Sequence, residues 1–375
     1  MPNLLINASG FPPQIKNGGP AKSIFNLVNV LKENFGVTVI ASNFDEGSTD
    51  KIIEKDVLKK EKLTVFYVDY KHYKIKNIYK IIKKSHPDII YQNSIFNYKT
   101  CLPALYYCKK QRKKCVLATR GELSQNALSF KKIFKLAYLF LVRLFLFPNK
   151  LIFHATSDQE SKDIKNQFKK GNVVVIPNLP SSHVITKVYE RDSVTKRFYY
   201  LGRIHKIKNL DTVLLSLKNI KSSLLFDIYG PIEDLDYWEH CKEIIELLPE
   251  NIKVNYCGII SPNESCELPT KYDCLIMPSF SENFGHSIVE AMMCKKIVIV
   301  TNNTPWTLVK ENGGFVCDPY DSKTFTEAIE CLLNMPTDEL EKRGQMIYAF
   351  INNELSLESS IKKYFKMFDL ESTNA

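Results

Sequence analysis

The chain has 375 residues, of which 45% are hydrophobic and 11% aromatic, a composition that excludes a disordered or fibrous protein. Its net charge of +10 is unevenly distributed: residues 1–180 hold 30 Lys and Arg against 13 Asp and Glu, and residues 181–375 hold 21 against 28. The basic half is therefore expected to face an anionic partner, such as nucleic acid, anionic lipid or a phosphorylated acceptor.

Ten cysteines occur without a Cys-x-x-Cys pair, and the seven histidines offer no metal-binding set. These features predict a reduced, cytosolic protein with no metal site. The first residues lack the basic segment and the long apolar run of a signal peptide, and no run reaches the roughly 20 apolar residues that span a bilayer.

Short β-rich runs alternate with helical stretches through the first half of the chain. The expected elements are 4–8, 21–35, 37–41, 63–68, 74–84, 89–91, 99–110, 116–119, 131–147, 151–155, 158–168 and 173–176. This alternation is typical of a parallel sheet with helices on both faces. We therefore expect a Rossmann-like domain over residues 1–180, and the amphipathic segment within 357–375 is a candidate helix for completing it.

A polar stretch without periodicity, residues 181–197, is the predicted linker. The alternation then resumes at 198–201, 210–220, 225–229, 237–248, 254–257, 274–277, 285–294, 297–300 and 324–333. These elements predict a second Rossmann-like domain over residues 198–356. Open α/β sheets bind ligands beyond the carboxyl ends of their strands, so the cleft is expected where those loops of the two domains meet.

The most informative segment reads Glu-Asn-Phe-Gly-His-Ser-Ile-Val-Glu from Glu282 to Glu290. It follows an apolar strand and opens a helix, where the free N–H groups of Asn283, Phe284 and Gly285 can bind an anion or a sugar hydroxyl. The two carboxylates lie at different depths. They can therefore accept hydrogen bonds from different parts of one hydroxyl-rich ligand, such as a nucleotide sugar.

Two further loops carry groups suited to phosphate. Gly18 and Gly19 follow the first strand, where their amides can approach a phosphate closely, although an ordinary capping turn has the same sequence. Arg203 and Lys208 follow the first strand of the second domain and together can neutralise a diphosphate. The alternative for this loop is a solvated basic segment.

In this order, the glycine pair, the Arg203 and Lys208 loop and the Glu282–Glu290 segment resemble the retaining GT-B glycosyltransferases of family 4, a bacterial group that builds polysaccharides and lipopolysaccharides. The resemblance covers nearly the whole chain. It implies an α/β GT-B fold, two Rossmann-like domains with a donor/acceptor cleft between them, and a hexosyltransferase-type activity. The donor would be a nucleotide-diphosphate sugar, UDP- or GDP-linked, and no cofactor or metal would be required.

The resemblance also implies residue roles. Arg203 and Lys208 would clamp the donor diphosphate, Glu290 would bind the nucleotide ribose, and Gly18 and Gly19 would approach the phosphates from the other domain. Glu282, with the backbone of Asn283, Phe284 and Gly285, would hold the donor sugar. The reaction would be glycosyl transfer, with retention, to a hydroxyl of a glycan or lipid-linked oligosaccharide in bacterial surface polysaccharide synthesis.

Two positions depart from the family pattern. Many relatives carry a histidine near the reacting sugar, where this chain has Arg120 and Glu122 in a Thr-Arg-Gly-Glu loop. These two residues are candidates for contacting the donor phosphate or the acceptor; an ion pair of Arg120 with Glu122 or another acid is the alternative. Asn209 stands where a glycine often follows the lysine, which can alter the loop.

Residues 131–147 are rich in Leu and Phe, with Lys132, Lys135 and Arg143 on one side. Such a helix can lie in an anionic membrane interface, or its apolar face can be buried in the first domain. The first option predicts a cytoplasmic protein bound peripherally to the inner face of the plasma membrane. A sugar-nucleotide epimerase or phosphorylase, or a non-catalytic nucleic-acid or glycan-binding protein, are the rival functions. No nucleic-acid-binding motif accompanies the basic clusters, so no nucleic-acid partner is expected.

Overall fold

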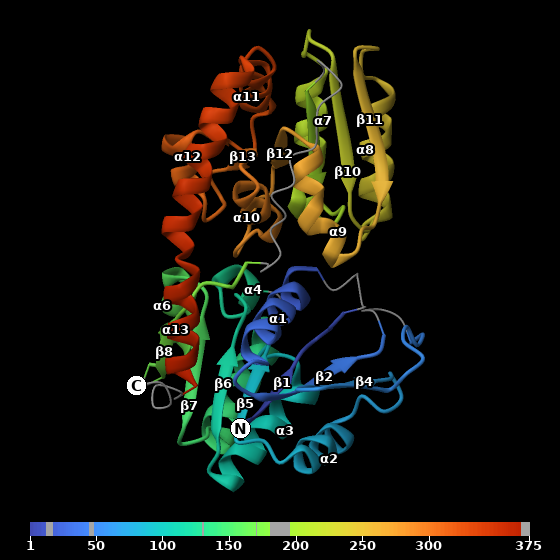
Figure 1. The fold of residues 1–375 in the computed structure, drawn as a ribbon. Coiled ribbons are helices and arrows are strands. Elements are labelled where there is room, and N and C mark those ends of the chain that lie inside the picture. The colour runs from blue at the N-terminus through green and yellow to red at the C-terminus, as the bar shows by residue number, and fades with distance from the viewer. Residues whose placement is uncertain (13–17, 45–48, 130, 170, 181–195, 369–375) are drawn as a thin grey trace. The chain divides into compact units, whose positions relative to one another are not determined.

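The computed structural model describes residues 1–12, 18–44, 49–129, 131–169, 171–180 and 196–368 (Figure 1). The chain divides into two compact units. Unit 1 comprises Met1–Leu179 and Glu358–Ala375, and unit 2 comprises Pro180–Leu357. Most of the predicted linker, 181–195, lies outside the described residues, and Arg197 of that stretch belongs to the first strand of unit 2.

Unit 1 is built on a sheet of eight strands in the order β3-β4-β2-β1-β5-β6-β7-β8. All neighbours are parallel except β3, which pairs antiparallel with β4. The strands are β1 (Asn3–Asn7), β2 (Gly36–Ser42), β3 (Val57–Lys60), β4 (Leu63–Val68), β5 (Ile89–Asn93), β6 (Lys114–Ala118), β7 (Leu151–Ala155) and β8 (Asn172–Val175).

Alternate residues of these strands enter two hydrophobic cores, one on each face of the sheet. In β6, for example, Cys115 and Leu117 join one core, whereas Val116 and Ala118 join the other. The first core is covered by α2 (Ile75–Ser85), α3 (Tyr98–Gln111), α4 (Gln125–Ser129), α5 (Lys132–Leu141), the π-helical turn η1 (Val142–Leu146) and α6 (Asp158–Gln167). The second is covered by α1 (Gly18–Leu31) and α13 (Leu357–Met367).

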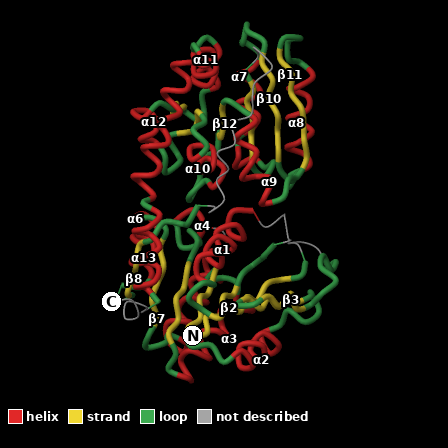
Figure 2. The backbone as a smooth tube through the Cα atoms, in the orientation of Figure 1, coloured by secondary structure: helices red, strands yellow, loops and turns green. Residues whose placement is uncertain are grey.

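Unit 2 contains a six-stranded parallel sheet in the order β11-β10-β9-β12-β13-β14. Its strands are β9 (Arg197–Leu201), β10 (Leu224–Tyr229), β11 (Ile252–Gly258), β12 (Cys274–Met277), β13 (Ile297–Thr301) and β14 (Phe315–Cys317). Its helices are α7 (Leu210–Leu217), α8 (Leu235–Glu246), α9 (Pro262–Glu267), α10 (His286–Met293), α11 (Ser322–Leu333) and α12 (Thr337–Leu355), with short turns η2 (Lys206–Lys208), η3 (Leu268–Lys271) and η4 (Thr307–Asn312). Strands and helices alternate along both units (Figure 2).

The structure contains elements that the sequence pattern did not predict. Two are short strands, β3 at an exposed sheet edge and β14 with three residues. The missed helices include the six-residue α9 and the 19-residue α12, whose pattern is interrupted by Gly344. A Cβ at Gly344 would lie 2.3 Å from the carbonyl oxygen of Lys295, so glycine is required for close packing of the helix and not for a turn.

Each sheet reverses its direction of growth next to its first strand. In unit 1 the chain builds outward from β1 to β2 and then returns to place β5 on the other side of β1. In unit 2 it builds from β9 to β11 and then returns to place β12 beside β9. Such switch points leave a crevice beyond the carboxyl ends of the two strands, because their connections leave in opposite directions.

Candidate functional site

The switch point of unit 2 brings together the two loops that the sequence singled out. Arg203 and Lys208 follow β9, and Glu282 to Gly285 follow β12, the strand that pairs with β9. The two loops are more than 70 residues apart in the sequence. The parallel pairing of β9 with β12 places them at the same edge of the sheet. Gly18, Gly19, Arg120 and Glu122 belong to unit 1.

The loop after β9 is fixed by its own domain. The hydroxyl of Tyr200 donates to the carbonyl oxygen of Arg203 at 2.8 Å. Gly230 packs against the same loop, because a Cβ at this glycine, whose φ is +139°, would lie 1.8 Å from the carbonyl oxygen of Gly202. The backbone that presents Arg203 therefore has little freedom to shift.

Asn209 adopts the conformation expected of a glycine at this position. Its φ of 57° and ψ of 36° lie in the left-handed region, which asparagine tolerates better than most residues. Its side-chain amide donates to the carbonyl oxygens of Pro278 at 3.1 Å and Pro319 at 2.8 Å. The departure from the family pattern thus keeps the backbone path and ties the β9 loop to the end of β12.

Lys208 and Glu282 form an ion pair at the centre of the site. The ammonium Nζ lies 2.5 Å from the Oε1 of Glu282, and the two side chains are only 14% and 12% exposed. The hydroxyl of Ser279 donates to the same carboxylate oxygen at 2.9 Å. Glu282 therefore holds the Lys208 ammonium in one place, a role that sequence spacing did not reveal.

Arg203 is more exposed and pairs with an acid that the sequence analysis did not identify. Its Nη1 donates to both carboxylate oxygens of Glu233, at 2.7 and 2.6 Å, and both side chains are close to half exposed. Burial, followed by the charge of Glu282, raises the pKa of Tyr200, and the Arg203 charge acts in the opposite direction. Both charged groups therefore lie close enough to influence the same buried hydroxyl.

The helix after β12 begins one residue later than the sequence indicated. Helix α10 starts at His286, and Gly285 is its N-cap in the left-handed region, with φ 71° and no side-chain capping bond. The first-turn amides are consequently those of Gly285 to Ile288 and not those of Asn283 and Phe284. The indole Nε1 of Trp306 donates to the Phe284 carbonyl oxygen at 2.5 Å and fixes the orientation of the peptide that enters the helix.

Glu290 lies inside unit 2. It is 1% exposed, and the thiol of Cys266 on α9 lies 4.0 Å from its Oε1. The Glu290 charge also contributes to raising the pKa of Tyr199, after burial and the nearby Cys294. Contact with a ribose therefore requires a rearrangement that exposes this carboxylate, a requirement that helix periodicity could not show.

In unit 1, Gly18 and Gly19 are the first two residues of helix α1, which the sequence analysis placed from residue 21. The difference reflects Pro20, which is compatible with a first helical turn because its missing N–H has no partner there. The side-chain hydroxyl of Ser23 also donates to the Gly19 carbonyl oxygen, at 3.0 Å.

Arg120 joins a polar network on the other side of the unit 1 switch point. Its guanidinium donates to Asn93 Oδ1 at 2.6 Å, Asn178 Oδ1 at 2.5 Å and the Tyr91 hydroxyl at 3.1 Å. These three contacts are with the side-chain amides of Asn93 and Asn178 and the phenol of Tyr91. The backbone of Arg120 has φ 54° and precedes Gly121, so the loop makes a tight turn.

His154 completes this network as a neutral group. Burial, then the Arg120 charge, lowers its pKa to about 4. Its Nδ1 lies 2.7 Å from the Tyr91 hydroxyl, and its Nε2 lies 2.8 Å from the Ile176 carbonyl oxygen. A carbonyl only accepts, so Nε2 carries the proton and Nδ1 accepts from Tyr91.

Two carboxylates hold the loop around Arg120. Burial opposes ionisation of Glu160, but hydrogen bonds from Thr156, Gly121 and Thr119 lower its pKa overall. Glu122 accepts from the Ser94 hydroxyl at 2.6 Å and the Ile95 amide at 2.7 Å, and burial raises its pKa. In this conformation Glu122 connects the loops after β5 and β6.

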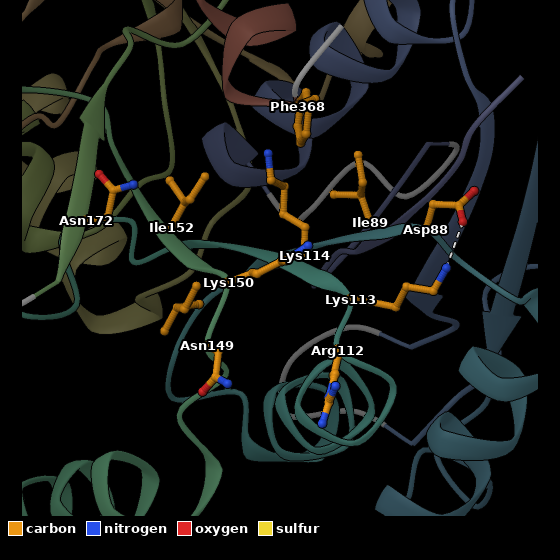
Figure 3. A pocket seen from close by; sticks show the side chains of 11 residues that line it. Asp88, Ile89, Arg112, Lys113, Lys114, Asn149, Lys150, Ile152, Asn172 and Phe368 are labelled. Atoms are coloured by element: carbon orange, nitrogen blue, oxygen red, sulfur yellow. Dashed lines mark hydrogen bonds and ion pairs between the residues drawn. The ribbon is translucent and has the colours of Figure 1, made fainter.

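The structure also contains a cavity at the opposite ends of the unit 1 strands from these loops. It has a volume of about 520 Å³ and lies at the amino-terminal ends of β6, β7 and β8 in unit 1 (Figure 3). Among the residues that the structure describes, no cluster of three His, Cys, Asp or Glu side chains suits a metal ion. None of the described helices is both long enough and apolar enough to cross a membrane.

Residues 181–352 match the family model described as glycosyl transferases group 1. The matched stretch coincides with most of unit 2. A segment of 101 residues is 31% identical to the O-antigen chain mannosyltransferase RfbU of Salmonella typhimurium. That segment spans 27% of this chain and 29% of the relative.

Solved structures share the fold over nearly the whole chain. Sucrose-phosphate synthase from Thermosynechococcus elongatus has a TM-score of 0.73 at 16% identity, covering 98% of both chains. Anabaena HepE, solved with UDP and glucose, has a TM-score of 0.71 at 16% identity, covering 98% of this chain and 100% of that one. A glycosyltransferase from Rickettsia africae has a TM-score of 0.70 at 18% identity, covering 99% of each. The predicted fold class, α/β with two Rossmann-like domains of the GT-B type, is confirmed.

Proposed function

We propose that the protein is a retaining glycosyltransferase that moves a sugar from a nucleotide-diphosphate donor, UDP- or GDP-linked, to a hydroxyl of a glycan or lipid-linked oligosaccharide. The observation that carries this proposal is the meeting of Arg203, Lys208 and the uncapped start of α10 at one switch point. The group 1 domain match supports it, because the matched residues include all three.

The chemical problem in such a reaction is the negative charge that accumulates on the departing diphosphate. Arg203 offers a forked donor and Lys208 a compact charge, and the first turn of α10 offers the positive end of a helix dipole. Fixed positive groups of this kind typically contribute on the order of 10² to 10³ in rate, about 3 to 4 kcal/mol each. We propose that they replace a metal ion in this role.

The two ion pairs define how the site changes when a donor arrives. Glu233 and Glu282 neutralise Arg203 and Lys208 in the free protein. A diphosphate would compete with both carboxylates for the cations. Glu282 would then be released toward the donor sugar, where its carboxylate can accept hydrogen bonds from the sugar hydroxyls. Glu290 would contact the ribose after a rearrangement that exposes its carboxylate.

The acceptor assignment is a finer part of the proposal. The partial match to an O-antigen chain mannosyltransferase supports a role in bacterial surface polysaccharide or lipopolysaccharide synthesis. In unit 1, the loops joined by Glu122 and the network around Arg120 are the proposed acceptor-side elements. A lipid-linked acceptor would place the reaction in the cytoplasm, at the inner face of the plasma membrane.

A thermal-shift titration with UDP, GDP, ADP and dTDP, each with Mg²⁺ and with EDTA, tests the donor site. A diphosphate at 100 times its dissociation constant stabilises the protein by about 2.7 kcal/mol, or about 5–11 °C for a unit of this size. We expect one base to be preferred, no dependence on metal, and loss of the shift in Arg203→Ala. Lys242→Ala, which removes an exposed cation from α8, is the matched control.

If none of the four diphosphates changes the melting temperature, the donor-site assignment is wrong. A shift that requires Mg²⁺ would contradict metal independence only. Retention is tested separately: the anomeric proton coupling of the product, followed by NMR, should show the same configuration as the donor. Release of diphosphate that depends on an acceptor hydroxyl would exclude an epimerase.

A further inference from the structure

Helix α5 and turn η1 present a continuous apolar surface to solvent. Ile133 and Phe134 are 82% and 79% exposed, and the other members are about half exposed: Leu136, Phe140, Leu141, Leu144 and Phe145. Their spacing of three, four and seven residues places them along one side of the helix. We call these seven residues the α5–η1 stripe.

The opposite side of the same helix already serves the fold. Leu139 and Val142 are buried in the core beneath the sheet, and Tyr138 donates its hydroxyl to the Ile95 carbonyl oxygen at 2.9 Å. The two alternatives from the sequence therefore describe different sides of one helix. Folding of unit 1 explains the buried side and leaves the stripe without a partner among the described residues.

Helices α2 and α3, which cover the same core as α5 and η1, carry positive charge alone. Helices α2, α3 and α5 with η1 contain ten Lys and Arg and no Asp or Glu. They cover the same core on one face of the sheet, and the ammonium of Lys109 on α3 donates to the Phe145 carbonyl oxygen in η1 at 2.6 Å. The stripe therefore borders a strongly cationic surface.

The cavity in unit 1 lies near the carboxyl ends of helix α3 and turn η1. Arg112 caps α3, and Asn149 and Lys150 follow η1 within four residues (Figure 3). Lys113, also in the lining, is paired with Asp88 at 2.9 Å. Among the described residues, Arg112 and Lys150 form no ion pair, so the cavity offers two available cations to a phosphate.

We propose that this face of unit 1 docks on an anionic lipid bilayer. The α5–η1 stripe would enter the boundary between headgroups and acyl chains, the cations of α2 and α3 would lie against the charged headgroups, and the cavity would receive a headgroup phosphate. A second copy of this chain is a poor occupant, because a symmetric contact through this face would place cations against cations. The inference rests on the surface of unit 1 and not on the transfer reaction.

The apolar contribution is tested by vesicle co-sedimentation of the full chain without any nucleotide. The wild type should bind vesicles of phosphatidylcholine with 30% phosphatidylglycerol, and the variant Ile133→Ser/Phe134→Ser/Phe140→Ser should bind about a hundredfold more weakly. The control variant Leu235→Ser/Leu247→Ser/Leu308→Ser replaces three exposed apolar residues in unit 2 and should bind as the wild type does.

The electrostatic contribution is tested by changing the lipid charge, the salt concentration and the cationic residues. Binding should be lost on pure phosphatidylcholine and at about 1 M salt, where the screening length is about 3 Å. Lys110→Gln/Arg112→Gln/Lys150→Gln should reduce affinity by about a hundredfold, at about 1 kcal/mol for each cation. Lys218→Gln/Lys221→Gln/Lys253→Gln is the equal-charge control in unit 2.

Equal binding of the stripe variant and the wild type, or equal binding to neutral and anionic vesicles, would overturn the proposal. So would a concentration-dependent dimer that the stripe variant abolishes, because the occupant would then be a second copy. Full competition by inorganic phosphate in solution, with no vesicle binding, would reduce the cavity to a free-anion site. The diphosphate thermal shift of each variant is measured in parallel and should be unchanged, which separates this test from that of the donor site.

Discussion

Replacing Lys208 with methionine separates the structural role of the Lys208–Glu282 pair from its proposed role in binding. The change removes the charge and keeps most of the aliphatic chain. Glu282 is then left 12% exposed without this cation, although the Ser279 hydroxyl still donates to it at 2.9 Å. A nearly buried charged group that loses its partner typically costs about 1–3 kcal/mol, so we expect a fall of about 2–12 °C in melting temperature.

The double variant Lys208→Met/Glu282→Gln removes the unpaired charge as well. Its melting temperature should return most of the way toward that of the wild type, because a neutral amide costs less to leave without a cation. Its affinity for the preferred nucleoside diphosphate should not recover. Loss of one charge-assisted contact corresponds to about 1.5–3 kcal/mol, or roughly 10- to 150-fold in the dissociation constant.

Differential scanning fluorimetry gives the stability of the four proteins, and isothermal titration calorimetry gives their affinities. Glu282→Gln alone should retain diphosphate affinity, since it leaves the Lys208 ammonium in place and removes its competitor. The reasoning is refuted if the double variant binds the diphosphate as tightly as the wild type. It is also refuted if Lys208→Met leaves both the melting temperature and the affinity unchanged.

Two further changes test the framework around the sites. Gly230→Ala should destabilise unit 2 by about 3 kcal/mol or more, because its Cβ meets the Gly202 carbonyl oxygen, whereas Gly258→Ala, with φ +79° and nothing within 4 Å, should cost only about 1 kcal/mol in denaturant titrations. For His154, the folded-state pKa of about 4 lies below the ordinary 6.5, so the unfolded chain binds more protons between these values. Its contribution is complete above pH 6.5 and is lost as pH falls toward 4, by at most about 3 kcal/mol. The pH dependence of unfolding should therefore be smaller in His154→Gln, and identical slopes for the two proteins would contradict the neutral assignment.

The α/β fold was predictable because parallel sheets buried on both faces leave apolar runs that alternate with amphipathic helices. The edge strand β3 and the short β14 carry too few buried residues for such a signal. The pattern of helix α12 is interrupted by Gly344, a residue type that usually indicates a break in a helix. Here glycine is needed because the carbonyl oxygen of Lys295, from a distant loop, leaves no room for a Cβ. Contacts between segments far apart in the chain are absent from any local pattern.

The site shows the same division. The positions of Arg203, Lys208 and Glu282 at one sheet edge follow from the parallel sheet that the alternation predicted, whereas the pairing of β12 with β9 was not predicted. Which carboxylate pairs with which cation depends on loop conformations fixed by Gly230 and Asn209, and these could not be read from spacing. The contact of Glu290 with Cys266 likewise lies outside the pattern, because Cys266 belongs to α9, a six-residue helix that the sequence pattern did not predict.

The return of the chain to unit 1 affects how that unit can be made. Tyr364 and Phe368 are buried in the second core of unit 1, where the Tyr364 hydroxyl donates to the Pro177 carbonyl oxygen at 3.2 Å and Phe368 packs against Phe35. During synthesis, residues 1–179 leave the ribosome first, but their core lacks these side chains until unit 2 has also been translated. Unit 1 must therefore wait in an incomplete form, with an apolar face open to solvent or to chaperones, while the second domain folds.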